Sequence, residues 1–146
     1  MKWYVVDASV IIKWLLGDES EPDQEKALNL LDAWVNGTVE LSAPTLWQYE
    51  VGNFLGRELH QDASEKMKLL LNLDIKSVDL TSAMFDRCFV WMRQKGITFY
   101  DASYLAVAAE TGADLVTADK KFTNRMREKD RICLLNDLDM GSDSRY

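Results

Sequence analysis

Short apolar runs alternate with longer segments of helical periodicity along this chain, and this alternation constrains its fold more than any other feature. The apolar runs are rich in β-branched and aromatic residues and are predicted to be strands at 2–6, 39–42, 75–78, 114–117 and 132–135. The intervening segments are predicted to be helices at 10–16, 22–36, 46–60, 63–73, 81–95, 100–111 and 120–128. Because parallel strands need crossover connections, which are usually helical, this order predicts an α/β fold whose central, mainly parallel sheet carries helices on both faces.

Residues with strong positional preferences mark several of the predicted helix ends. Ser9 is placed to cap the helix that follows the first strand, and Pro22 is placed to open the next one. Gly37, Gly96 and Gly112 each come directly after a helical pattern, where a residue with left-handed backbone conformation commonly ends a helix. The predicted connections are therefore short.

Size and composition predict a single domain. The 146 residues, 47% of them apolar, are enough for one core, which we expect over 1–138, followed by a polar tail at 139–146. Asp7 and Lys13 interrupt the most hydrophobic stretch, so neither a membrane span nor a signal peptide is predicted. Cys88 and Cys133 lack the spacing of a zinc or redox motif and are expected to be buried, reduced thiols. These features together predict a cytoplasmic protein without a membrane partner.

The charge balance limits how this chain can contact nucleic acid. A formal net charge of −7 argues against attraction over the whole surface, because affinity for nucleic acid depends largely on neutralising phosphates. A local basic stretch begins at Lys120 and Lys121 and includes Arg125. Such a stretch is either a phosphate contact or an ordinary solvated helix face.

Four acidic residues occupy or border the junctions between the predicted elements. Asp7 and Asp119 follow predicted strands, and Asp101 lies in the first turn of its predicted helix. Glu50 is expected in the middle of another helix, at the edge of its apolar face. Taken singly, Asp101 and Asp119 are explained by helix capping and Glu50 by a solvated helix surface. Taken together, four converging carboxylates would repel one another unless a cation neutralised them, so the set predicts a metal-dependent enzyme.

The local sequences around these acids resemble those of a known family. The segments 6–10 (VDASV), 49–53 (YEVGN), 100–103 (YDAS) and 117–119 (TAD) are similar to the four acidic motifs of PIN-domain nucleases, and most similar to those of VapC-type toxins. The resemblance extends from residue 2 to about residue 135. It implies a three-layer α/β/α sandwich and metal-dependent endonucleolytic cleavage of RNA.

The resemblance also implies roles for individual residues. The acidic cluster would be Asp7, Glu50, Asp101 and Asp119, with Ser9, Asn53 and Thr117 as polar support and Lys120, Lys121 and Arg125 as RNA contacts. Hard carboxylate ligands suit Mg²⁺ or Mn²⁺, which Asp7 and Asp101 would hold most directly. The implied partners are RNA, a VapB-like antitoxin and a second copy of the chain. The antitoxin helix is expected on the apolar surfaces of 10–16 and 27–35.

Other chemistries remain open at this point. A phosphotransferase could use Asp7 as its nucleophile, although Ser9 stands where dehalogenase-like phosphatases have a second acid. A binding module without activity, or a PIN nuclease that acts in RNA maturation, would also carry these acids. A small reading frame upstream would distinguish a toxin from a maturation nuclease.

The histidine and the tryptophans are assigned mainly structural roles. His60 is the only histidine and has no neighbouring nitrogen or sulfur ligand in the sequence, so neither a zinc site nor a serine hydrolase relay is predicted. Most of the five tryptophans are expected in the core, and Trp14 and Trp47 are the two considered for stacking on RNA bases.

Overall fold

The computed structural model describes residues 1–16, 23–126 and 131–140, and within these ranges five parallel strands form one sheet. The strands are β1 (Lys2–Val6), β2 (Val39–Pro44), β3 (Lys76–Val78), β4 (Asp114–Thr117) and β5 (Ile132–Leu134). Their order across the sheet is β3-β2-β1-β4-β5. The chain therefore builds the sheet outward from β1 in one direction and then crosses over to build it in the other.

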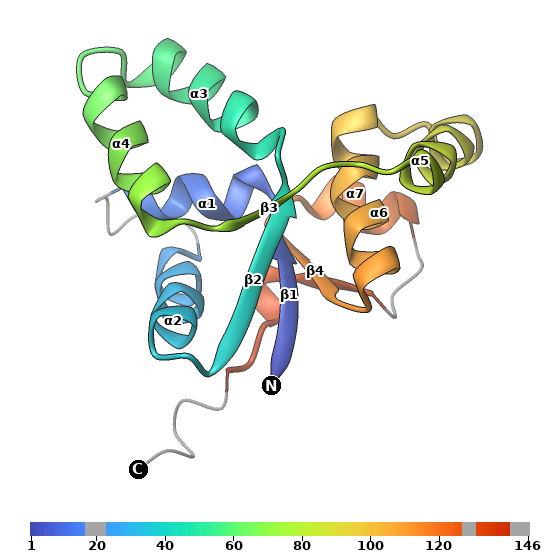
Figure 1. The fold of residues 1–146 in the computed structure, drawn as a ribbon, viewed down its shortest axis with the longest axis horizontal. Coiled ribbons are helices and arrows are strands. Elements are labelled where there is room, and N and C mark those ends of the chain that lie inside the picture. The colour runs from blue at the N-terminus through green and yellow to red at the C-terminus, as the bar shows by residue number, and fades with distance from the viewer. Residues whose placement is uncertain (17–22, 127–130, 141–146) are drawn as a thin grey trace.

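Helices cover both faces of the sheet, as the alternation predicted. They are α1 (Ala8–Leu15), α2 (Gln24–Val35), α3 (Trp47–Glu58), α4 (Ala63–Leu73), α5 (Ser82–Lys95), α6 (Phe99–Thr111) and α7 (Lys120–Met126), and a short 3-10 helix, η1, spans Leu135–Asp137. Helices α1 to α4 lie on one side of the sheet, and α5 to α7 lie on the other (Figure 1). The three-layer α/β/α architecture is confirmed.

The centre of the sheet is the most deeply buried part of the molecule. β1 pairs with β2 on one side and with β4 on the other, with Val5 opposite Leu115 and Val6 opposite Val116. All four of these side chains are fully buried. α6 packs across β1, β2 and β4, and its own middle turns are buried as well. Continuous burial of this kind is typical of parallel strands covered on both faces.

The helix ends differ from the predicted ones in a few places. Asp7, not Ser9, caps α1, because its carboxylate accepts from the backbone N–H groups of Ser9 and Val10. Gly96 and Gly112 have positive φ angles of 67° and 75° and end α5 and α6, as predicted. The predicted opening at Pro22 and the tail beyond residue 140 lie outside the described residues.

The two cysteines are free thiols, and they differ in burial. Cys88 is fully buried, whereas Cys133 is half-buried. Among the residues that the structure describes, no helix has both the length and the apolar character needed to cross a bilayer.

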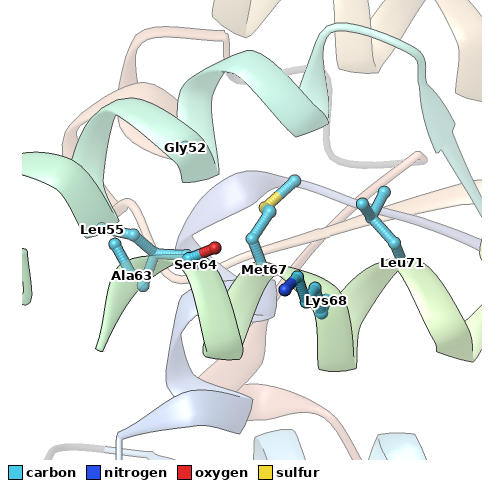
Figure 2. Close-up of a pocket in the computed structure, with 7 residues that line it drawn as sticks. All are labelled: Gly52, Leu55, Ala63, Ser64, Met67, Lys68 and Leu71. Carbon is cyan, nitrogen blue, oxygen red and sulfur yellow. The ribbon is translucent and has the colours of Figure 1, made fainter. Parts of the chain in front are cut away.

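An apolar groove of about 380 Å³ lies between α3 and α4. Met67 and Leu71 project from α4 toward α3, where Gly52 leaves open space, and Lys68 lies at the edge (Figure 2). Part of this surface is exposed, since Leu71 retains 46% of its accessible area. The groove is an unfilled apolar feature of the surface formed by these two helices.

Candidate active site

The site lies where the order of the strands reverses. β1 and β4 are parallel neighbours, and the connections leaving them run to opposite sides of the sheet. Asp7 follows the last residue of β1, and Asp119 lies two residues beyond Thr117, which ends β4. Open α/β sheets bind ligands in the crevice outside the carboxyl ends of such strands. The fold therefore brings two of the four acids to the same edge although they are far apart in the sequence.

All four acids lie at or near a helix N-terminus. Asp7 caps α1, Asp119 accepts from the N–H of Phe122 at 3.1 Å at the start of α7, and Asp101 lies in the first turn of α6. Glu50 lies in the first turn of α3, so its predicted placement in the middle of a helix was wrong. Helix N-termini carry partial positive charge, which favours carboxylates there. Capping explains part of the role of Asp7 and Asp119, whereas Thr98, not Asp101, caps α6.

Asp7 is the most tightly held of the acids. Only 8% of its surface is exposed. Its Oδ1 accepts from the hydroxyl and the N–H of Ser9, and its Oδ2 accepts from the hydroxyl of Thr117. The Ser9 hydroxyl in turn accepts from the N–H of Ala118 at 3.1 Å. These bonds join the end of β1 to the end of β4 and fix the orientation of the carboxylate.

The acids influence one another through space. The pKa of Asp7 is raised to about 6, because burial and the charge of Asp101 raise it by more than the hydroxyls of Ser9 and Thr117 lower it. Burial also raises the pKa of Asp101, and the charge of Asp119 raises it further. The pKa of Glu50 is raised by burial and by Asp101 and is lowered by a hydrogen bond. Asp101 is therefore the carboxylate that couples electrostatically to the other three.

The hydrogen bond on Glu50 comes from a residue that the sequence analysis missed. The Tyr104 hydroxyl donates to Glu50 Oε1 at 2.7 Å, and the Tyr104 side chain is only 2% exposed. Burial and the neighbouring Glu50 raise the pKa of Tyr104 strongly, so its hydroxyl stays protonated as a donor. Tyr104 lies three residues after Asp101 in α6, and this helical spacing was the one signal that could have placed it near the acids.

The chemistry of the carboxylates fits a hard divalent cation, but the side chains are not gathered into a complete metal site. Among the described residues, no three aspartate, glutamate, histidine or cysteine side chains are grouped so that they could hold a metal ion. Each of three acids has a hydrogen-bonding partner elsewhere, namely Thr117 for Asp7, Tyr104 for Glu50 and Phe122 for Asp119. Asp7 is buried and Glu50 and Asp101 are half-buried, and such desolvated carboxylate oxygens still suit Mg²⁺ or Mn²⁺.

The remaining predicted site residues differ in their exposure and in what their side chains contact. Asn53 is exposed on α3 and lines a pocket with Glu50. Lys120 and Lys121 are exposed at the start of α7, directly after Asp119. Arg125 is already engaged, because its guanidinium donates to the carbonyl of Gly96 at 2.7 Å and so joins α7 to the end of α5.

The two tryptophans considered for base stacking both have structural roles. Trp47 is 1% exposed and its Nε1 donates to the hydroxyl of Ser77. Trp14 is half-buried and its Nε1 donates to the carbonyl of Ala27 at 2.8 Å, which joins α1 to α2. Both rings are used to hold helices in place.

Known proteins resemble this chain in sequence and in fold. The family model described as PIN domain matches residues 4–127. Ribonuclease VapC3 of Pyrobaculum aerophilum is 29% identical over 128 residues, which cover 83% of this chain and 92% of that protein. Exonuclease VapC9 of the same organism is 32% identical over 96 residues, covering 62% of this chain and 70% of that protein. A toxin-antitoxin complex from Klebsiella pneumoniae has the same fold, with a TM-score of 0.67 at 16% identity over 92% of this chain and 99% of that one. The chain belongs to the PIN-domain family.

Proposed function

We propose that this protein is a metal-dependent endoribonuclease and the toxin of a VapBC-type toxin-antitoxin pair. The observation that carries the proposal is the set of four acids at or near helix N-termini, each within one of the four matching motifs, with two of them just after the neighbouring strands β1 and β4. The names of the relatives VapC3 and VapC9 support a nuclease, and the toxin-antitoxin complex with the same fold supports an antitoxin partner. A cytoplasmic location and a homodimer remain predictions.

Asp7 and Asp101 would hold a Mg²⁺ or Mn²⁺ ion, with Glu50 and Asp119 as further ligands or as ligands of its water. A bound divalent ion lowers the pKa of water and stabilises charge on the phosphate. The burial of Asp7 and Asp101 supports this assignment, because desolvated carboxylates gain most from a compensating cation.

The residues of the chain would position the reacting groups. Ser9 and Thr117 hold both oxygens of Asp7 in a fixed orientation. Tyr104 engages Glu50 Oε1, and Glu50 Oε2 would orient the attacking water. This network would keep the carboxylates aligned while the phosphodiester bond is hydrolysed, and no side chain needs to act as nucleophile.

Lys120 and Lys121 would contact the RNA backbone beside Asp119. Both are exposed and lie in the first turn of α7, whereas Arg125 already contacts Gly96. Lys120→Ala combined with Lys121→Ala should weaken RNA binding and flatten its dependence on salt, because phosphate contacts release counterions. Unchanged affinity and salt dependence would remove these lysines from the proposal.

The first experiment is cleavage of a mixed cellular RNA pool by purified, partner-free protein in Mg²⁺, in Mn²⁺ and in EDTA. Asp7→Asn is the inactive variant, and Asp86→Asn, at an exposed position on α5, is the matched control. Internal cuts that require metal and are lost only in Asp7→Asn are expected. Removal of terminal nucleotides alone would correct the endonuclease assignment, a distinction that matters because one relative is named an exonuclease. Full activity of Asp7→Asn would refute the site.

Three other functions are each distinguished by a separate observation. A PIN nuclease of RNA maturation would cleave but would have no small reading frame upstream. A binding module would gain thermal stability from Mg²⁺ without cleaving RNA. A phosphotransferase would form a trapped phosphate on Asp7.

The α3–α4 groove is the surface proposed for the antitoxin. Its apolar lining and partial exposure suit one face of an amphipathic helix. On α1, by contrast, Val10 and Ile11 are fully buried, so this helix offers less free surface than expected. Met67→Glu should weaken co-purification with the product of an upstream reading frame and leave the RNA cleavage of free protein intact. Loss of both properties, or of neither, would contradict this placement.

A further inference from the structure

A second cavity, of about 460 Å³, opens beside the acids. It is lined from α1, α3 and α6, and it includes Glu50 together with Ile12, Tyr49, Asn53, Arg57 and Tyr100. Its volume lies in the lower half of the range typical of small-ligand pockets, roughly 300–1,000 Å³. This volume suits one small ligand group, such as a nucleobase.

Two exposed tyrosines flank this cavity. Tyr49 on α3 is 72% exposed and Tyr100 on α6 is 54% exposed, although rings of this size usually lie in the interior. Each directly precedes an acid of the site, Tyr49 before Glu50 and Tyr100 before Asp101. Exposed aromatic faces are the surfaces on which unpaired bases stack. The site therefore combines stacking surfaces with carboxylates within a few residues of each other.

The polar residues of the cavity follow one side of α3. Tyr49, Asn53 and Arg57 are spaced four residues apart, so they lie above one another on the helix surface. The Asn53 amide both donates and accepts hydrogen bonds, which suits a base edge, and the Arg57 guanidinium suits a phosphate. Arg57 contacts Glu58 at 3.4 Å in an exposed pair, which contributes little to stability and can open at low cost.

We propose that this cavity binds one unpaired nucleobase of the RNA, next to the phosphate that is cut. The base stacks on Tyr49 and Tyr100, Asn53 contacts its edge, and Arg57 holds the adjoining phosphate. Because Glu50 belongs to both the cavity and the acidic group, a nucleotide bound there brings its phosphodiester to the acids. The inference rests on the proposed ribonuclease function and adds to it the residues of this chain that receive the base, which must be unpaired because a paired base is stacked within its helix.

The test measures binding without cleavage. Asp7→Asn protein is titrated in Mg²⁺ into fluorescently labelled octamers of adenosine, uridine or cytidine and into a hairpin duplex, and binding is followed by anisotropy. We expect a preference for the octamers, and about 5-fold or greater loss of affinity on adding Tyr49→Leu or Tyr100→Leu, the factor that corresponds to one stacked base. Tyr49→Phe and Tyr100→Phe keep the ring and should bind like the parent. Phe89→Leu, at an exposed aromatic on α5 outside the cavity, is the matched control.

A modified RNA tests the same contact on unaltered tyrosines. Octamers with a single abasic position, moved along the strand, should bind about 5-fold or more weakly at one position only, and this loss should disappear in the leucine variants. Asn53→Ala should reduce the differences among the three octamers and leave the abasic effect. Equal binding by the leucine variants and the parent, or a preference of the parent for duplex, would overturn the proposal.

The outcome separates this inference from the proposed function. Tyrosine-dependent binding by a protein that never cleaves RNA would refute the nuclease and support the cavity. Metal-dependent cleavage with tyrosine-independent binding would support the nuclease and overturn the cavity. Leucine variants that bind RNA normally but have a different oligomeric state in solution would overturn the proposal, and would show that the tyrosines contact a second copy of the chain.

Discussion

The burial of Asp7 predicts that the contribution of this carboxyl to stability falls as pH rises. The pKa of this carboxyl is raised by burial from 3.8 to about 6. Between these pH values the folded protein retains a proton that the unfolded chain has released, so the free energy of unfolding falls with increasing pH. The interval between the two pKa values corresponds to a decrease of about 3 kcal/mol in the free energy of unfolding, at roughly 1.36 kcal/mol for each pH unit. This loss of stability is complete above the pKa of Asp7 in the folded state, and there is no loss below its pKa in the unfolded state.

Asp7→Asn should therefore stabilise the protein at neutral pH while removing its activity. Asparagine keeps the size and part of the hydrogen bonding but never becomes charged. In EDTA, the variant should exceed the wild type by as much as about 3 kcal/mol at pH 7 and match it near pH 4. Urea unfolding followed by tryptophan fluorescence at several pH values between 4 and 7 measures this difference directly.

A matched substitution and a metal titration complete the test. Asp86→Asn, at an exposed position, should leave the pH dependence of the wild type unchanged. Mg²⁺ should stabilise the wild type at pH 7 and should stabilise Asp7→Asn much less, because a cation that binds only the folded state raises its stability. Parallel pH profiles for the wild type and Asp7→Asn would refute the assignment of this energy to the buried carboxylate.

Three further substitutions test individual contacts. Tyr104→Phe removes the donor that lowers the pKa of Glu50, so the acid limb of the RNA cleavage profile should move to higher pH, and an unmoved limb would contradict this role. Thr98→Ala removes the cap of α6 and should cost about 1 kcal/mol in urea unfolding, whereas Thr98→Ser should cost little; equal effects would exclude the cap. Leu115→Ala truncates a fully buried side chain of β4 and should cost about 2–5 kcal/mol in the same assay, and a cost similar to that of an exposed residue would contradict the central position of this strand.

Local signals in the sequence were sufficient to predict the order of elements. The helix at 63–73 and the strand at 114–117 have the predicted bounds, and Gly96 and Gly112 end their helices as expected. Periodicity and backbone conformation are properties of neighbouring residues, so they can be read without knowledge of the tertiary contacts. The same information located the four acidic motifs and indicated the family.

Side-chain environments were predicted less well. Trp47 was considered for stacking and is buried, whereas its neighbour Tyr49, two residues on, is exposed beside Glu50. Both lie in the first turn of one helix, and only the packing of α3 determines which side faces the core. A helix of moderate amphipathicity does not by itself specify this rotation.

The sequence by itself determined the α/β alternation, the helix ends and the set of acids, because these depend on short-range periodicity, turn chemistry and residue type. Only the tertiary structure decided how the acids are held. The Tyr104 hydroxyl reaches Glu50 across 54 residues of sequence, and the Thr117 hydroxyl reaches Asp7 across 110. Such contacts depend on which strands become neighbours and on how helices cross the sheet. Those choices are made by the packing of the whole core, and no local segment encodes them.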